Sequence, residues 1–255
     1  MYNIYVIFNV CFILIASLIT DRINAENYKI TDQIFMDVKI EDDYTGRIIF
    51  GLFGEVAPKT VKNFKHIALQ GIDGKRYVGT NFIIAIKRVM IQGGDILYNN
   101  GSGSISIYGE HFEDETFEVK PDSGGLLAMV NDGVPNTNGC MFFITTMPAP
   151  WLEGKYVIFG KVLRGHEVVH KIEQLKTDYS DRLKSNVQII KCGQISFTPF
   201  YEDHKNYEYV FAMQRITIWA WIKAGWFPLS FSFAILAFFH YLLNKLNSLQ
   251  HNKYE

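Results

Sequence analysis

The sequence predicts a mainly β protein, a closed antiparallel barrel with two helices, followed by one C-terminal transmembrane helix. Three observations predict this class. Many short apolar or alternating segments are separated by turn-forming residues, which is typical of antiparallel strands. Two segments between them have helical periodicity instead. A long uncharged apolar run near the C-terminus is sufficient to cross a bilayer.

The composition sets broad limits on function. The chain has 255 residues, enough for one or two domains, and a formal net charge of −1. It therefore lacks the basic character that would favour a nucleic-acid partner. The sequence contains no P-loop, zinc-ligand spacing or nucleophile elbow, so we expect neither a metal ion nor another cofactor.

The N-terminal segment resembles a secretory signal peptide. Residues 4–19 form an uncharged apolar run that is short for a membrane span, and Ala25 offers a small residue for cleavage. We therefore expect residues 1–25 to be a signal peptide. Because residues 1–3 contain no lysine or arginine, an uncleaved anchor is the alternative.

The C-terminal apolar run is expected to anchor the protein. Residues 224–243 contain no aspartate, glutamate, lysine or arginine, and tryptophans lie near their start as in an interfacial aromatic belt. The expected organisation is a domain over 26–197, a juxtamembrane linker over 198–223, the span, and a cytosolic tail over 244–255. A cleaved signal would place the domain in the lumen of the endoplasmic reticulum, on a single-pass protein of its membrane.

The domain between these ends is read from its periodicity. Helices are expected at 58–70, where Pro58 suits the first turn, and at 167–175. The polar stretch 99–106 is expected to be a flexible loop. Strands are expected at 33–40, 47–53, 81–90, 126–130, 141–145, 156–163 and 187–196.

The segment 131–160 is the most informative part of the chain. Its sequence, NDGVPNTNGCMFFITTMPAPWLEGKYVIFG, predicts two strands that bracket a proline-rich loop. The loop presents Trp151 and Leu152, while Phe143 and Tyr156 belong to the flanking segments. These four side chains either line a small apolar pocket or belong to an ordinary core, and their spacing does not decide between the two.

Several motifs in this order resemble the cyclophilins, the peptidyl-prolyl cis-trans isomerases. They are MIQGGD at 90–95, SIYGEHFEDETF at 106–117, PNTNGCMFFIT, WLEGK and VIFGKV, and the resemblance covers roughly residues 30–196. It implies an eight-stranded barrel capped by two helices, proline-containing protein clients and weak cyclosporin binding. It also implies a peptide groove, with Tyr156 in place of a histidine: Met90, Gln92, Asn131, Phe143, Trp151, Leu152 and Tyr156.

The position of the family's catalytic arginine is occupied by Ile84. In cyclophilins the arginine ends an F-H-R motif before MxQGGD, whereas this chain has Phe82-Ile83-Ile84. Isoleucine has no hydrogen-bond donor, and loss of a transition-state donor lowers rates by about 10²- to 10³-fold. The sequence therefore supports either a weakened isomerase or a non-catalytic binding protein, with no certain catalytic residue. Arg88 is an alternative donor if it lies on the same strand face as Ile84.

The C-terminal segment resembles the membrane-anchored photoreceptor cyclophilins in its WIKA sequence at 221–224 and FHY sequence at 239–241. This resemblance implies a membrane protein client such as an opsin, which the groove or the span itself would recognise. Asn100-Gly101-Ser102 is an N-glycosylation sequon, and it is usable if the domain is luminal. Cys140 and Cys192 either form a disulfide or remain two buried thiols.

Overall fold

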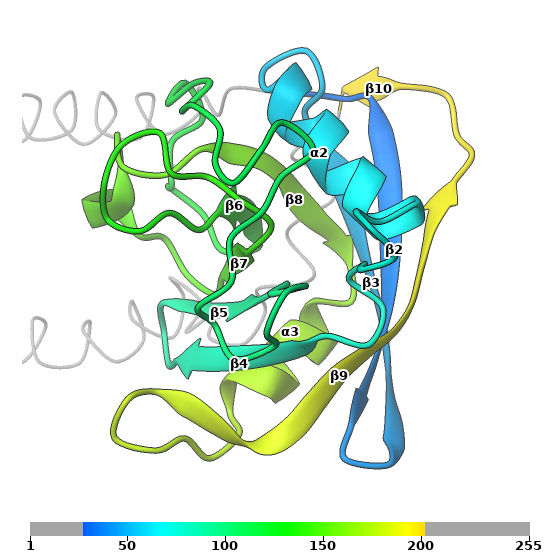
Figure 1. The fold of residues 1–255 in the computed structure, drawn as a ribbon, viewed down its shortest axis with the longest axis vertical. Coiled ribbons are helices and arrows are strands. Elements are labelled where there is room, and N and C mark those ends of the chain that lie inside the picture. Colours follow the sequence, from blue (N-terminus) through cyan, green and yellow to red (C-terminus); the bar gives the residue numbers. More distant parts are fainter. Residues whose placement is uncertain (1–27, 202–255) are drawn as a thin grey trace, which may run out of the picture. The chain divides into compact units, whose positions relative to one another are not determined.

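The computed structural model describes residues 28–201 and contains a closed eight-stranded antiparallel barrel, as expected. The strands follow the order β2-β3-β8-β6-β7-β5-β4-β9 around the barrel (Figure 1). Their bounds are β2 (Asp32–Ile40), β3 (Asp43–Leu52), β4 (Asn81–Ile86), β5 (Met90–Gly93), β6 (Leu126–Met129), β7 (Phe142–Thr145), β8 (Ile158–Arg164) and β9 (Arg182–Ile195). The expected signal peptide and membrane span lie outside the described residues. Within 28–201, no helix is both long and apolar enough to cross a bilayer.

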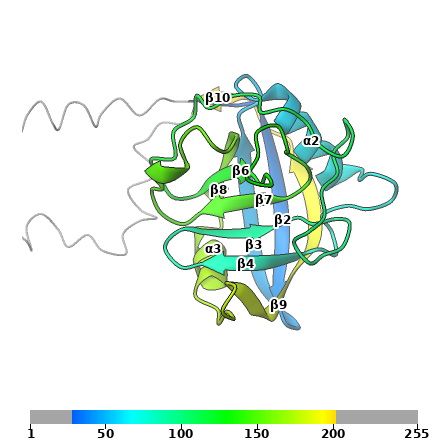
Figure 2. The same cartoon turned by 60° about the vertical axis from the view of Figure 1, so that its left-hand side comes forward.

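Two helices, α2 (Pro58–Leu69) and α3 (His166–Glu173), cover different ends of the barrel, as Figures 1 and 2 show. The interior is filled by inward-facing side chains of the strands and by one face of each helix. Phe142 is its centre, since its ring makes edge-to-face contacts with four other buried aromatic rings, those of Phe50, Phe64, Tyr77 and Phe82. Such contacts add to the stabilisation from burying apolar area.

The start of α2 is capped from a distant segment. Ala57, at the N-cap position, offers no side-chain acceptor. The carboxylate of Glu115 replaces it by accepting hydrogen bonds from the backbone nitrogens of Lys59 and Thr60, both at 2.9 Å. A negative charge at this end of a helix also interacts favourably with the helix dipole. Pro58 lies in the first turn, as its sequence position predicted.

The prediction of one strand over 81–90 was wrong, because this stretch is a hairpin of β4 and β5. The chain reverses at residues 87–89, where the amide of Val89 donates to the carbonyl of Ile86 at 3.0 Å and Arg88 has a φ of 60°. Buried Glu173 of α3 accepts a hydrogen bond from the Arg88 amide at 2.6 Å. A contact from another element therefore fixes a turn that lacks the usual turn-forming residues.

The loop that follows β5 contains the polar stretch 99–106, and a buried carboxylate holds the first half of that stretch. Asp95 is completely buried and accepts five backbone hydrogen bonds. The donors are the amides of Leu97, Tyr98, Asn100, Gly101 and Gly103, at 2.8–3.1 Å. Burial by itself raises the pKa of Asp95, but these hydrogen bonds outweigh burial and hold its pKa below the ordinary value.

Two further features were not settled by the sequence. The short strands β1 (Lys29–Ile30) and β10 (Phe200–Tyr201) pair with each other, so both ends of the described segment lie side by side. Cys140 and Cys192 are both free thiols, so they do not pair; of the two buried thiols expected in that case, Cys140 is buried and Cys192 is half-buried. Burial raises the pKa of Cys192 to about 12.

Candidate functional site

A row of paired residues crosses the outer face of the barrel. Ile84 of β4 is paired with Gln92 of β5, Gln92 with Phe143 of β7, and Phe143 with Ala128 of β6. Directly opposite residues of antiparallel strands project to the same face. The row therefore brings Ile84, where the family resemblance led us to expect an arginine, onto the same surface as two predicted groove residues.

Two residues of this row, Ala128 and Phe143, belong to a second apolar cluster that is separate from the barrel interior. Phe143 is buried in it, and three other predicted groove residues pack against it: Met90, Leu152 and Tyr156. The ring of Tyr156 meets that of Phe143 edge to face, with 5.2 Å between centroids. Phe143, Leu152 and Tyr156 are therefore not part of the barrel interior, and of these three only Phe143 is fully buried.

The other predicted groove residues lie around this cluster. Trp151 is 51% exposed and belongs to the 3-10 turn η1 (Pro150–Leu152), which the proline-rich loop forms. Asn131 donates to the carbonyl of Lys155 at 2.8 Å, which ties its loop to the segment before Tyr156. Gln92 is nearly buried, and its amide lies 4.0 Å from the sulfur of Met141, a weak acceptor.

Two concavities adjoin these residues. One, of 220 Å³, is lined by Asn131 and Tyr156 together with the exposed side chains of Phe117 and Val134. The other, of 700 Å³, is lined by polar and apolar residues of the 97–111 segment, by Ile72 and Asp73, and by Asp132. At its edge, Nδ1 of His111 lies 3.0 Å from the Ser104 hydroxyl.

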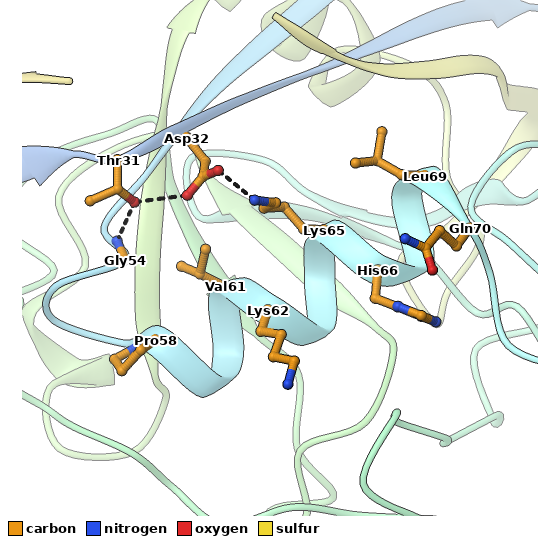
Figure 3. Close-up of a pocket in the computed structure, with 10 residues that line it drawn as sticks. All are labelled: Thr31, Asp32, Gly54, Pro58, Val61, Lys62, Lys65, His66, Leu69 and Gln70. Atoms are coloured by element: carbon orange, nitrogen blue, oxygen red, sulfur yellow. Dashed lines mark hydrogen bonds and ion pairs between the residues drawn. The ribbon is translucent and has the colours of Figure 1, made fainter. Parts of the chain in front are cut away.

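A third concavity, of 450 Å³, lies elsewhere, along α2 where β2 begins (Figure 3). Lys65 reaches from the helix to Asp32 with 2.5 Å between the charged atoms, while Lys62 and His66 point away from β2. None of the predicted groove residues lines it.

The cyclophilin-type peptidyl-prolyl cis-trans isomerase family model matches residues 35–194, which span the whole barrel except the first residues of β2 and the last residue of β9. The chain belongs to the cyclophilins. It is 44% identical, over 92% of its length and 96% of the relative's, to a rhodopsin-specific peptidyl-prolyl cis-trans isomerase isozyme of Calliphora vicina. It is also 43% identical, over 69% of its length and 77% of the relative's, to peptidyl-prolyl cis-trans isomerase D of Saccharomyces cerevisiae. Isomerase B of the same yeast is 41% identical over 71% of this chain and 88% of its own.

For this cyclophilin, the structure does not support the expected position of Arg88. Arg88 lies in the turn between β4 and β5 rather than on the strand face of Ile84. A different cation, Arg182, is paired with Ile84 across β4 and β9. Sequence reasoning missed it because it began the last strand at 187, whereas β9 begins at Arg182. Residues 182–186 are mostly polar, so no apolar pattern marks this part of the strand.

Proposed function

We propose that this cyclophilin is a membrane-anchored luminal chaperone that binds proline-containing segments of a membrane protein client, such as an opsin, and isomerises them weakly. The face formed by Ile84, Gln92 and Phe143, with the adjoining apolar cluster, is the proposed binding surface. The Calliphora relative, whose name specifies rhodopsin, supports the type of client. Its similarity covers 92% of this chain, well beyond the family segment at 35–194.

The position of Ile84 carries the catalytic part of the proposal. Rotation about an X–Pro bond faces a barrier of about 20 kcal/mol, because the amide loses its resonance when it twists. The prolyl nitrogen then regains a lone pair, and a donor aimed at that atom stabilises the twisted state selectively. Ile84 lies on the same face as Gln92 and Phe143, yet its side chain has no donor. Binding therefore survives better than catalysis.

The test is prolyl isomerisation of a proline tetrapeptide by the full chain, purified in mild detergent, beside its Ile84→Arg variant. We expect wild-type turnover only modestly above the uncatalysed rate, and a gain of about 10²-fold or more in the variant. Ile190→Arg is the matched control, because Ile190 is an exposed isoleucine of β9 outside the proposed face. Full turnover by the wild type, or no gain in Ile84→Arg, would contradict a weakened active site.

The location in the secretory pathway is part of the same proposal. Asn100 is exposed, and its side-chain oxygen accepts hydrogen bonds from the amide and hydroxyl of Ser102, the third residue of its sequon. This supports an accessible glycosylation site on a luminal domain. Expression in secretory cells should give a protein whose mass falls on endoglycosidase treatment. Asn100→Gln should abolish that shift, whereas Asn99→Gln should retain it.

Two alternatives are kept because specific features favour them. A purely non-catalytic chaperone is favoured by Ile84, and it predicts peptide binding without any measurable turnover. Recognition through the predicted span at 224–243 predicts that an unrelated apolar helix of equal length abolishes opsin co-purification. Our proposal predicts that such an exchange leaves binding of soluble proline peptides unchanged. Weak cyclosporin binding to the same face is expected, and calorimetry on the full chain would measure it.

A further inference from the structure

Arg182 is the cation that the fold places next to the missing donor. It is the first residue of β9, and its Cα is paired with that of Ile84 at a register shift between β4 and β9. Paired residues of antiparallel strands have Cα atoms about 4.5–5.5 Å apart. The long, exposed side chain of Arg182 thus starts one strand away from the position where the family's arginine stands.

The backbone of Arg182 is held on both sides. Its amide donates to the carboxylate of Asp178 at 2.9 Å, and its carbonyl accepts from the Asp178 amide, also at 2.9 Å. These bonds close the loop that precedes β9. Backbone hydrogen bonds from Arg182 and Ser180 lower the pKa of Asp178 below its ordinary value. The arginine therefore projects from a fixed position.

The head of the side chain contacts the loop that follows β5. Nη1 of Arg182 donates to the carbonyl of Asn100 at 2.8 Å. The neighbouring Gly101 lies close to β4, since a Cβ built on it would be 3.8 Å from the Ile83 side chain. This bond uses one of the five donors of a guanidinium, and the others stay available for a ligand.

We propose that Arg182 is the donor that this cyclophilin uses in place of the arginine lost at Ile84. Resting on the function proposed above, it donates to the prolyl nitrogen as the bound amide twists. Because it reaches the reacting bond from the neighbouring strand, it stabilises the twisted state less well than an arginine at position 84. Residual turnover therefore depends on Arg182.

The test compares Arg182→Met, which keeps the length of the side chain, and Arg182→Lys, which keeps its charge. Arg164→Met is the matched control, since Arg164 is an exposed arginine at the end of β8 and is paired with Ile49 of β3. For each full-length chain in detergent, we would measure kcat/KM for a proline tetrapeptide, the peptide Kd and the midpoint of thermal unfolding. The Kd and unfolding measurements separate a lost transition-state contact from damage to the loop at Asn100.

We expect Arg182→Met to lower kcat/KM by about tenfold or more, with the peptide Kd changed less than threefold and the unfolding midpoint little changed. Arg182→Lys should be intermediate, and the control should match the wild type. Unchanged turnover in Arg182→Met, or an equal loss in the control, overturns the role of Arg182 while the proposed function stands. A wild-type chain that binds the peptide without turnover overturns both this role and weak catalysis, and leaves only the non-catalytic alternative.

Discussion

Replacing Asp95 by asparagine tests how the loop beside the candidate site is held. One carboxylate oxygen accepts the amides of Leu97 and Tyr98, and the other accepts those of Asn100, Gly101 and Gly103. Asparagine has a single acceptor oxygen, and its amide nitrogen can only donate. Whichever way it is oriented, two or three backbone donors lose their acceptor and face another donor.

The expected magnitude follows from that count. A buried donor left without an acceptor costs about 1–3 kcal/mol. Residues 98–100 are exposed, so water satisfies part of the loss and the lower end of the range applies. We therefore expect Asp95→Asn to lower the free energy of unfolding by about 3 kcal/mol, or the midpoint of thermal unfolding by roughly 6–12 °C.

The assay is urea denaturation and thermal unfolding of the full chain in detergent, at pH 7 and at a series of lower pH values. The pKa of Asp95 is depressed in the folded state, so its stabilisation is present above the ordinary aspartate pKa and is lost as pH falls through the depressed value. The difference between wild type and Asp95→Asn should therefore shrink on acidification. Asp122→Asn, at an exposed position, is the control and should change stability by less than about 0.5 kcal/mol. A loss below about 1 kcal/mol at pH 7, or a difference independent of pH, would refute this reasoning.

Three further predictions concern other parts of the fold. Glu115→Gln should lower stability by about 1 kcal/mol in urea denaturation, because it weakens the cap of α2, and an unchanged midpoint would contradict that role. Cys140 and Cys192 should resist alkylation at pH 8 until denaturant is added, because burial raises the pKa of each thiol; rapid labelling of the folded protein, mapped by mass spectrometry, would show otherwise. Burial alone raises the pKa of Glu173, but hydrogen bonds, the largest from His170, lower the pKa overall. The stability that ionised Glu173 gives to the fold should therefore be lost as pH falls through the pKa that Glu173 has in the folded protein. Hydrogen exchange at the Arg88 amide should accelerate in Glu173→Gln, and unaltered exchange would exclude the contact as the support of that turn.

The sequence predicted those elements whose cause is local. The alternation in β2 and the position of Pro58 in α2 each depend on neighbouring residues, and both predictions were confirmed. The turn at Arg88 depends instead on a carboxylate from α3, far along the chain. Residues 85–90 read AIKRVM, which contains no glycine, proline or asparagine, so the hairpin had no local signal.

The candidate site also contains residues that the sequence predicted and a residue that it did not. The residues of the apolar cluster follow from the family motifs, which place Met90, Phe143 and Tyr156 in known order along the chain. The position of Arg182 beside Ile84 could not be predicted in this way. Arg182 lies at the start of β9, where no apolar pattern marks a strand, and its pairing with Ile84 follows a shift in the register of β4 and β9. Strand register is a property of the whole barrel, and only the structure brings these two residues together.

The outer face of the barrel can change its chemistry at little cost to the fold. Ile84 is half-buried on that face, whereas Phe82, two residues earlier, and Ala85, the next residue, are buried in the core. A change of side chain at position 84 therefore leaves the core residues in place, and Ile84 is not part of the apolar cluster that contains Phe143 and Met90. Interactions made equally with substrate and transition state support binding without supporting rate. Under the proposed function, an isoleucine at position 84 would therefore lower turnover more than client binding, which is the behaviour expected of a chaperone that isomerises slowly.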